Sequence, residues 1–328
     1  MSKLVTIFGG SGFVGRYIAQ RLAADGWRVR VAVRRPNEAI FVRPYGVVGQ
    51  VEPVFCNIRD DASVEAVTRG ADAVVNCVGT FQKSGKNNFT AVQNEGAERV
   101  ARIAAEQGVS ALVHISALGI DRDDQSAYAA SKRAGEGGIL QHFPTAMILR
   151  PSVIFGPEDG FFNRFAGMTR MGPVFPLVGG HTKFQPVYVE DVALAAAKGA
   201  EGKAHGVYEL GGPEVKSLRG WIDVILDVVK RDKVVINLPM WMGRLMAFSL
   251  DMLQTVTLGL FNNGLLTRDQ AKQLGFDNTV SEGANTLQDL GIEPVAAEAI
   301  LDTYLWRYRP SGQYDEIRES AAHMRRPY

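Results

Sequence analysis

The sequence predicts an α/β fold: a doubly wound parallel sheet with a smaller, mainly helical C-terminal region. Two observations predict it. Short apolar runs alternate with longer stretches of helical periodicity, and a glycine-rich segment separates the first run from the first helical stretch. The 328 residues are enough for two domains. We place the first at residues 1–200 and the second at residues 201–328.

Six apolar runs are expected to be strands, because runs rich in Val, Ile and Ala suit a sheet that is covered on both faces. They are Leu4–Phe8, Arg28–Val33, Val51–Cys56, Ala73–Cys77, Ala111–Ser116 and Ala146–Leu149. The expected helices between them are Val14–Ala24, Ala62–Arg69, Phe89–Gln107 and Tyr128–His142. Further along we expect long loops over Pro151–Gly180, strands at Phe184–Val189 and Val207–Leu210, and helices at Glu190–Ala200 and Leu218–Lys230.

Composition excludes several classes of protein. Lys and Arg number 36 and Asp and Glu 35, so the net charge is +1, and no basic excess indicates nucleic-acid binding. Cys56 and Cys77 are interpreted as reduced core thiols, and neither they nor the histidines show the spacing of a metal site. The apolar start is too short for a signal peptide, and we expect no export segment and no obvious membrane-spanning helix.

The glycine-rich segment has the spacing of a dinucleotide-binding loop. It reads Gly9, Gly10, Ser11, Gly12, Phe13, Val14 and Gly15. Glycines there let the strand turn sharply, let the backbone approach a pyrophosphate and let the helix pack tightly, while the helix N-terminus attracts the phosphates. The alternative is a glycine turn without a ligand. Its place in the alternating pattern favours nucleotide binding and a Rossmann fold.

The end of the second expected strand predicts which dinucleotide is bound. An acidic residue there usually holds the ribose hydroxyl of NAD, but this strand ends in Arg34 and Arg35. These arginines, with Arg16 in the first helical turn, can pair with a 2′-phosphate. We therefore expect NADP(H) in preference to NAD. The alternative is a solvated basic strand end.

Three further residues could carry chemistry. Tyr128 and Lys132 are four apart on an expected helix and share one face, and Ser116 closes the preceding strand. A nearby ammonium could stabilise the Tyr128 phenolate, and Ser116 could donate a hydrogen bond to a carbonyl that accepts hydride.

Taken together, these features resemble the extended or atypical branch of the short-chain dehydrogenase/reductase family over about residues 1–215. The matching pieces also include Asn57, Ile58, Val78, Gly79, Asn94, Pro151 and Ser152. The resemblance implies that Asn57 and Ile58 lie near the adenine, and that Val78 and Gly79 lie along the cofactor. It places Pro151 and Ser152 beside the nicotinamide, and Ser116, Tyr128 and Lys132 in the catalytic set, whether active or vestigial.

A narrower resemblance spans nearly the whole chain. Several stretches are similar to the nucleotide-binding accessory subunit of respiratory complex I (NADH:ubiquinone oxidoreductase), an atypical member of that superfamily. They include Phe8–Tyr17, Val42–Gly46, His114–Leu118, Pro151–Phe162, Gln185–Val192 and Leu287–Glu293. The resemblance implies a structural NADPH and contact with other complex I subunits at the junction of the peripheral and membrane arms. The absence of a transit segment favours a bacterial chain at the cytoplasmic face of the inner membrane; a mature eukaryotic chain would lie on the matrix side.

Two functions remain open at this point: an NADP-dependent reductase, epimerase or dehydratase, and a nucleotide-holding subunit. The stretch Val234–Thr267 carries only two charges, Arg244 and Asp251. It could be a buried helix pair, a surface that docks on a partner or at a membrane interface, or a spanning helix. The complex I resemblance favours docking, centred on Trp241–Met252.

Overall fold

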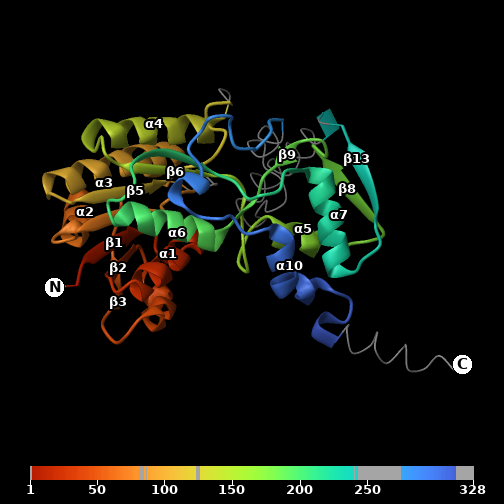
Figure 1. Ribbon diagram of the computed structural model, residues 1–328, viewed down its shortest axis with the longest axis horizontal. Coiled ribbons are helices and arrows are strands. Elements are labelled where there is room, and N and C mark those ends of the chain that lie inside the picture. Colours follow the sequence, from red (N-terminus) through yellow and green to blue (C-terminus); the bar gives the residue numbers. More distant parts are fainter. Residues whose placement is uncertain are drawn as a thin grey trace, which may run out of the picture. The chain divides into compact units, whose positions relative to one another are not determined.

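The computed structural model describes residues 2–80, 85, 87–122, 126–239, 241–242 and 275–314 (Figure 1). The chain forms two compact units. The first is built from Met1–Ser152, Val187–Gly211 and Thr279–Pro294, and the second from Val153–Pro186, Gly212–Asn278 and Val295–Tyr328. This division differs from a single boundary near residue 200, because two later segments return to the first unit. Whether residues 201–328 act as one docking region stays a prediction.

The first unit holds a seven-stranded parallel sheet in the order β11-β6-β5-β4-β1-β2-β3, which confirms the predicted doubly wound fold. The strands are β1 (Leu4–Phe8), β2 (Arg28–Val33), β3 (Val51–Phe55), β4 (Ala73–Asn76), β5 (Ala111–Ile115), β6 (Met147–Pro151) and β11 (Gly206–Leu210). The strand order reverses beside β1, where the chain continues into β2 on one side and β4 pairs on the other. Ligands of doubly wound sheets bind at such a switch point, at the carboxyl ends of the strands.

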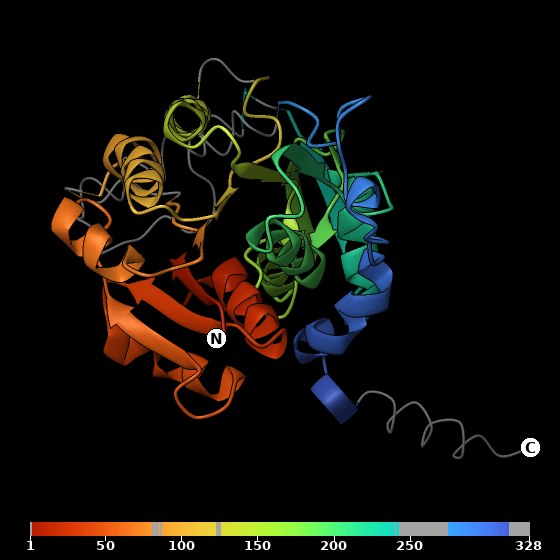
Figure 2. The same ribbon diagram turned by 60° about the vertical axis from the view of Figure 1, so that its left-hand side comes forward.

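Helices cover both faces of this sheet (Figures 1 and 2). On one face α1 (Phe13–Ala24) packs against α6 (Val189–Ala200). On the other face a buried cluster joins the sheet to α2 (Asp61–Thr68), α3 (Glu95–Glu106) and α4 (Ala127–His142). A 3₁₀ segment, η1 (Pro36–Tyr45), follows β2, and a π-helical turn, η2 (Thr90–Asn94), precedes α3. The expected helix Phe89–Gln107 is therefore two elements.

The second unit combines helices with short strand pairs. Its helices are α5 (Phe162–Met168), α7 (Leu218–Val229) and α10 (Ala297–Leu305), β8 (Val174–Val178) pairs with β13 (Val234–Leu238), and β9 (Lys183–Phe184) pairs with β12 (Lys216–Ser217). The buried Trp221 packs edge-on against Phe162, with ring centroids 5.7 Å apart, and its indole N–H donates to the Phe184 carbonyl. The remaining short elements of the second unit are β7 (Ile154–Phe155), η4 (Trp306–Tyr308) and η5 (Gly312–Tyr314), whereas β10 (Val187–Tyr188) and η3 (Gln288–Leu290) belong to the first unit.

The stretch Val234–Thr267 is described only in part. Its first five residues form β13, so the helix-pair interpretation is wrong for Val234–Leu238. Residue 240 and residues 243–267 lie outside the described residues, and docking through Trp241–Met252 stays a prediction. Within the described ranges, no helix has both the length and the apolar character needed to cross a membrane.

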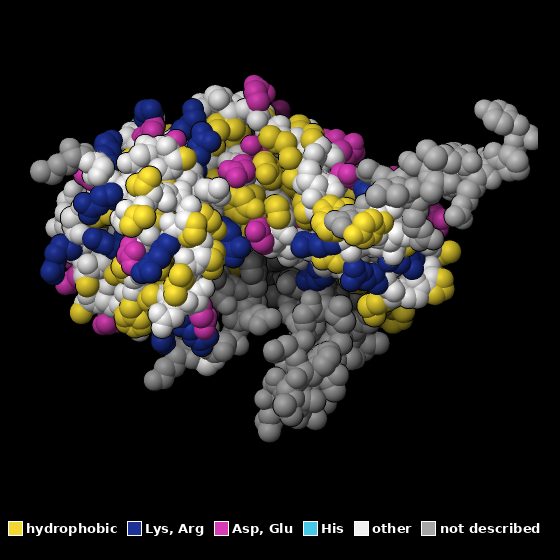
Figure 3. Space-filling view, turned by 90° about the horizontal axis from the view of Figure 1, so that it is seen from below, with side chains coloured by type: hydrophobic (Ala, Val, Ile, Leu, Met, Phe, Trp, Pro, Cys, Tyr) yellow, Lys and Arg dark blue, Asp and Glu magenta, His cyan; other side chains and the backbone are white. Residues whose placement is uncertain are grey.

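Figure 3 shows a face on which Lys and Arg side chains are interspersed with Asp and Glu side chains.

Candidate nucleotide-binding site

The glycine loop makes a tight turn from β1 into α1. Gly9 has a φ of +74°, a conformation that favours glycine, and its amide donates to the Ala32 carbonyl of β2 at 2.9 Å. The Gly12 amide donates back to the Gly9 carbonyl at 3.0 Å, and Gly12 is the N-cap of α1. The loop therefore brings the N-terminus of α1 to the carboxyl end of β1.

Two glycines of this loop have different roles. A Cβ on Gly15 would lie 2.4 Å from the Gly9 carbonyl oxygen and 2.7 Å from the Gly10 Cα, so only glycine lets α1 pack this closely on the loop. A Cβ on Gly12 would meet, among the described residues, only the Gly9 carbonyl oxygen, at 3.2 Å. The space before the helix N-terminus is thus open, and the first turn of α1 carries no acidic residue. This cradle fits a pyrophosphate.

The three predicted arginines lie near the same end of the sheet, in different settings. Arg16 donates to the Ser11 carbonyl at 3.3 Å, and its guanidinium carbon lies 4.9 Å from the centre of the Phe41 ring. Arg34 is exposed at the end of β2. Arg35 is also exposed and pairs with Glu38 at 3.0 Å. An exposed ion pair of this kind is weak, so Arg35 can exchange Glu38 for a phosphate at little cost.

The two residues predicted to lie near the adenine, Asn57 and Ile58, make contacts within the protein itself. The Ile58 side chain belongs to the buried core cluster under α2 and α3. The Asn57 backbone amide donates to the Ser63 hydroxyl at 2.9 Å. Asn94 is the last residue of the π-helical turn. The positions expected for Asn57 and Ile58 beside an adenine, and the cofactor contact expected for Asn94, stay predictions.

The carboxyl ends of β4, β5 and β6 carry the other predicted residues. Val78 and Gly79 follow β4, and a Cβ on Gly79 would lie 3.8 Å from the Lys132 Nζ. Pro151 and Ser152 end β6 and are both buried; the Ser152 amide donates to the Leu210 carbonyl at 2.8 Å. The structure therefore brings Gly79 beside the candidate catalytic helix.

Ser116, Tyr128 and Lys132 are all buried at the carboxyl end of β5. The Lys132 ammonium donates to the Ile115 carbonyl at 2.9 Å, one residue before Ser116. The Ser116 hydroxyl has no hydrogen-bond partner within the part of the chain that the structure describes. A buried polar atom left in this state indicates a missing partner, such as water or a bound group. The Tyr128 ring packs edge-on against Phe89, with centroids 6.0 Å apart.

Burial sets the protonation of this set. It lowers the pKa of Lys132 to about 8, and the nearby Glu136 and Cys77 oppose that shift. Burial also raises the pKa of Tyr128 above the ordinary value of a phenol. The stabilised phenolate and the catalytic role expected for Tyr128 stay predictions. Burial also raises the pKa of the Cys77 thiol to about 12, in line with a reduced core thiol.

Two residues around this set, Arg150 and Gln93, make contacts that were not predicted from the sequence. Arg150 donates to both Glu136 carboxylate oxygens, at 3.0 and 2.6 Å, and to Asp121 at 2.6 Å, which anchors α4 to β6. The signal for this pair was an arginine at the end of an apolar run and a glutamate one turn beyond Lys132. Gln93 joins the loop after β4 to α4. His114 is buried, and neither ring nitrogen has a partner among the described residues; burial and the Lys132 charge hold its pKa well below the usual range.

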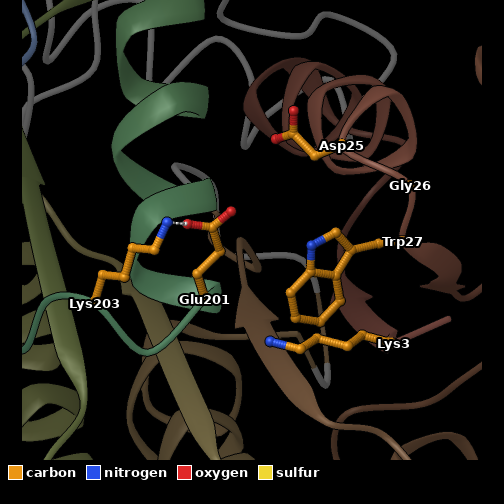
Figure 4. A pocket seen from close by; sticks show the side chains of 6 residues that line it. All are labelled: Lys3, Asp25, Gly26, Trp27, Glu201 and Lys203. Carbon is orange, nitrogen blue, oxygen red and sulfur yellow. Dashed lines mark ion pairs between the residues drawn. The ribbon is translucent and has the colours of Figure 1, made fainter. Parts of the chain in front are cut away.

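A separate cavity of about 320 Å³ lies at the amino ends of β1 and β2, away from the glycine loop (Figure 4). It is lined by Lys3, Asp25, Gly26, Trp27, Glu201 and Lys203. The Lys3 ammonium lies 5.2 Å from the centre of the Trp27 ring, and Glu201 pairs with Lys203 at 2.7 Å. Among the described residues, no three His, Cys, Asp or Glu side chains gather as metal ligands would.

Comparison with known proteins defines the class of this site. A family model described as the NAD dependent epimerase/dehydratase family matches residues 5–211, which include the glycine loop, Ser116, Tyr128 and Lys132. The chain belongs to this NAD dependent epimerase/dehydratase family. A nicotinamide dinucleotide is therefore the cofactor class that the family description gives. A UDP-glucose 4-epimerase from Thermus thermophilus, solved in complex with NAD, shares the fold with a TM-score of 0.65 at 20% identity, covering 94% of this chain and 99% of that one.

More specific relatives are respiratory. The chain is 33% identical over 316 residues to a protein of Arabidopsis thaliana named NADH dehydrogenase [ubiquinone] 1 alpha subcomplex subunit 9, mitochondrial. That match covers 94% of this chain and 79% of the relative. A ceramide reductase of Caulobacter vibrioides is 31% identical over 207 residues, covering 63% of this chain and 64% of that protein. The resemblance to complex I subunits is confirmed, whereas the expectation of a bacterial chain is not supported, because these subunits are mitochondrial.

Proposed function

We propose that this chain is an accessory subunit of respiratory complex I that holds NADPH, and that the nucleotide supports its stability and its assembly into the complex. One observation carries the proposal: similarity to the mitochondrial subunit covers 94% of the chain and so extends well past residue 211, where the family model ends. A shared nucleotide fold alone would account for the first 211 residues only.

The preference for NADPH rests on the charges at the end of β2. Arg34 and Arg35 are exposed there, and Arg16 lies in the first turn of α1. When bound, the nicotinamide supplies hydride exchange. The chain's own contribution is to hold phosphates at the glycine loop and α1, and to hold the ribose end with Lys132. The open space before Gly12 and the unpartnered Ser116 hydroxyl support the fit.

Titration calorimetry of the purified protein tests this preference. We expect tighter binding of NADPH than of NADH. Arg34→Glu should weaken NADPH binding at least tenfold, because a charge-assisted contact contributes about 1.5–3 kcal/mol. The matched control is Arg28→Glu, which also changes an exposed arginine but at the opposite end of β2, and which should leave both affinities unchanged. Equal affinity of the unmodified protein for the two nucleotides would remove NADPH preference from the proposal.

The place of the subunit is proposed from the same relatives. We infer a peripheral position at the junction of the peripheral and membrane arms, in contact with other complex I subunits. In a mitochondrion this is the matrix side of the inner membrane. The mitochondrial names of the relatives support this location.

A second candidate is an NADP-dependent reductase, epimerase or dehydratase acting on a small substrate. Two observations favour it: Tyr128 and Lys132 are both buried one helical turn apart on α4, and the chain is similar to a ceramide reductase. Tyr128→Phe separates the candidates, since it removes only the phenol oxygen. For a subunit, NADH:quinone activity per assembled complex should fall little. A hundredfold loss, about 2.7 kcal/mol of barrier, would put the enzyme first.

A further inference from the structure

A buried glutamine joins two parts of the candidate site. Gln93 is 1% exposed and lies in the π-helical turn η2. Its amide nitrogen donates to the Thr80 carbonyl at 2.7 Å, and its amide oxygen accepts from the Ser131 hydroxyl at 2.7 Å. Both bonds are short; the bond from Ser131 is buried and the bond to Thr80 is part-buried, so solvent does not readily replace the first of them.

The two hydrogen bonds of Gln93 end on two segments of the candidate site: the residues that follow β4, and helix α4. Thr80 directly follows Val78 and Gly79, the stretch expected to run along the nucleotide. Ser131 directly precedes Lys132 on α4, and its hydroxyl also lies 2.7 Å from the Tyr128 carbonyl. A Cβ on Gly79 would lie 3.8 Å from both the Gln93 amide nitrogen and the Lys132 ammonium, so these groups converge on one point.

The backbone is shaped to admit this glutamine. A Cβ on Gly135 of α4 would lie 2.1 Å from the Gln93 carbonyl oxygen, and a Cβ on Gly138 would lie 2.9 Å from the Cβ of Glu98. Two glycines on one face of α4 therefore let η2 and α3 approach far more closely than side chains would allow. Single π-helical turns are often found at functional sites, because the widened turn redirects a residue.

We propose that Gln93 is a positioning residue of the nucleotide site: it fixes the loop after β4 at a set distance from Lys132 and Tyr128. This inference rests on the proposed binding of NADPH. Gln93 itself need not touch the nucleotide. Its removal would let the Gly79–Thr80 backbone and α4 drift apart, and the two walls of the site would no longer be held at one spacing.

The test compares two glutamines of the same helical layer. Gln93→Met keeps the length of the side chain and removes both bonds. Gln107→Met is the control for loss of a glutamine bond to the backbone at an exposed position, because the Gln107 side-chain amide donates to the Glu65 carbonyl at 3.2 Å and neither residue belongs to the candidate site. We first measure the unfolding temperature of each variant. The NADPH dissociation constant is then measured by calorimetry at a temperature where all variants are folded. We expect about a tenfold weaker NADPH affinity for Gln93→Met and less than a twofold change for Gln107→Met.

Ser131→Ala is the milder variant, since it removes one oxygen and leaves the bond to Thr80. We expect NADPH affinity to fall about threefold, and this variant decides the matter if Gln93→Met does not fold. An NADPH affinity within twofold of the unmodified protein, in Gln93→Met or, failing that, in Ser131→Ala, would overturn the positioning role. If the unmodified protein itself fails to bind NADPH, the proposed function falls, and that outcome is seen before any variant is made.

Discussion

Gly15→Ala is the substitution whose cost can be worked out most directly. The added Cβ would lie 2.4 Å from the Gly9 carbonyl oxygen, whereas ordinary contacts need about 3.4 Å or more, so α1 must retreat by about 1 Å. Both nearest atoms are backbone atoms and cannot turn aside. Overpacking of this kind costs about 1–3 kcal/mol, and the gain of alanine in a helix offsets about 0.5–1 kcal/mol of it. We expect a net loss of about 1–2 kcal/mol of unfolding free energy.

The assay pairs thermal unfolding with NADPH titration. Gly15→Ala should lower the unfolding temperature by about 2–6 °C and weaken NADPH binding at least tenfold, because the helix N-terminus moves away from the phosphates. Gly137→Ala is the control: it is a helical glycine of α4 with nothing within 4 Å of its Cβ position, and it should be neutral or stabilising. A Gly15→Ala protein with unchanged unfolding temperature and unchanged affinity would refute the packing argument.

Other substitutions separate binding from stability. Gly12→Val should abolish NADPH binding and lower the unfolding temperature less than Gly15→Ala does, since its Cβ would meet one carbonyl oxygen of the protein at 3.2 Å but would also lie against a bound pyrophosphate. Normal nucleotide content would remove Gly12 from the site. Folded Lys132 releases its proton from about pH 8, whereas the unfolded chain holds it to about 10.5, so stability should rise with pH across that window relative to Lys132→Met. Urea unfolding at several pH values measures this, and parallel curves would contradict it. Arg150→Met leaves the buried Glu136 carboxylate unpaired and should lower the free energy of unfolding by about 3–5 kcal/mol, measured with a chemical denaturant. Adding Glu136→Leu should recover most of this loss. Equal stability of the single and the double variant would be inconsistent with a buried ion pair.

Local signals explain why so much of the first unit was predictable. Leu4–Phe8 and Arg28–Val33 match β1 and β2 residue for residue: the first is a fully buried apolar run, and the second ends in the three buried residues Val31–Val33. The first helix was expected at Val14–Ala24 and begins one residue earlier. In contrast, β13 pairs with β8 some sixty residues away, and no local pattern in Val234–Leu238 reports that pairing.

The candidate site divides in the same way. Spacing alone predicted the glycine loop and the shared face of Tyr128 and Lys132. It could not predict the direction of the Tyr128 pKa, which burial raises, because burial is a property of the packed chain. Nor could it single out Gln93, whose two partners are 13 and 38 residues away in sequence. Buried polar links of this kind become visible only when the segments they join are placed together.

The central claim is that this chain works as a nucleotide-holding part of complex I. Native electrophoresis of detergent-solubilised membranes, with detection of this chain beside an NADH-oxidation stain, tests it most directly. We expect the chain to migrate with the large NADH-oxidising assembly, and the Gly12→Val chain to be found there in a much smaller amount. Migration of the unmodified chain only as a free protein or small oligomer would contradict the claim and favour the reductase.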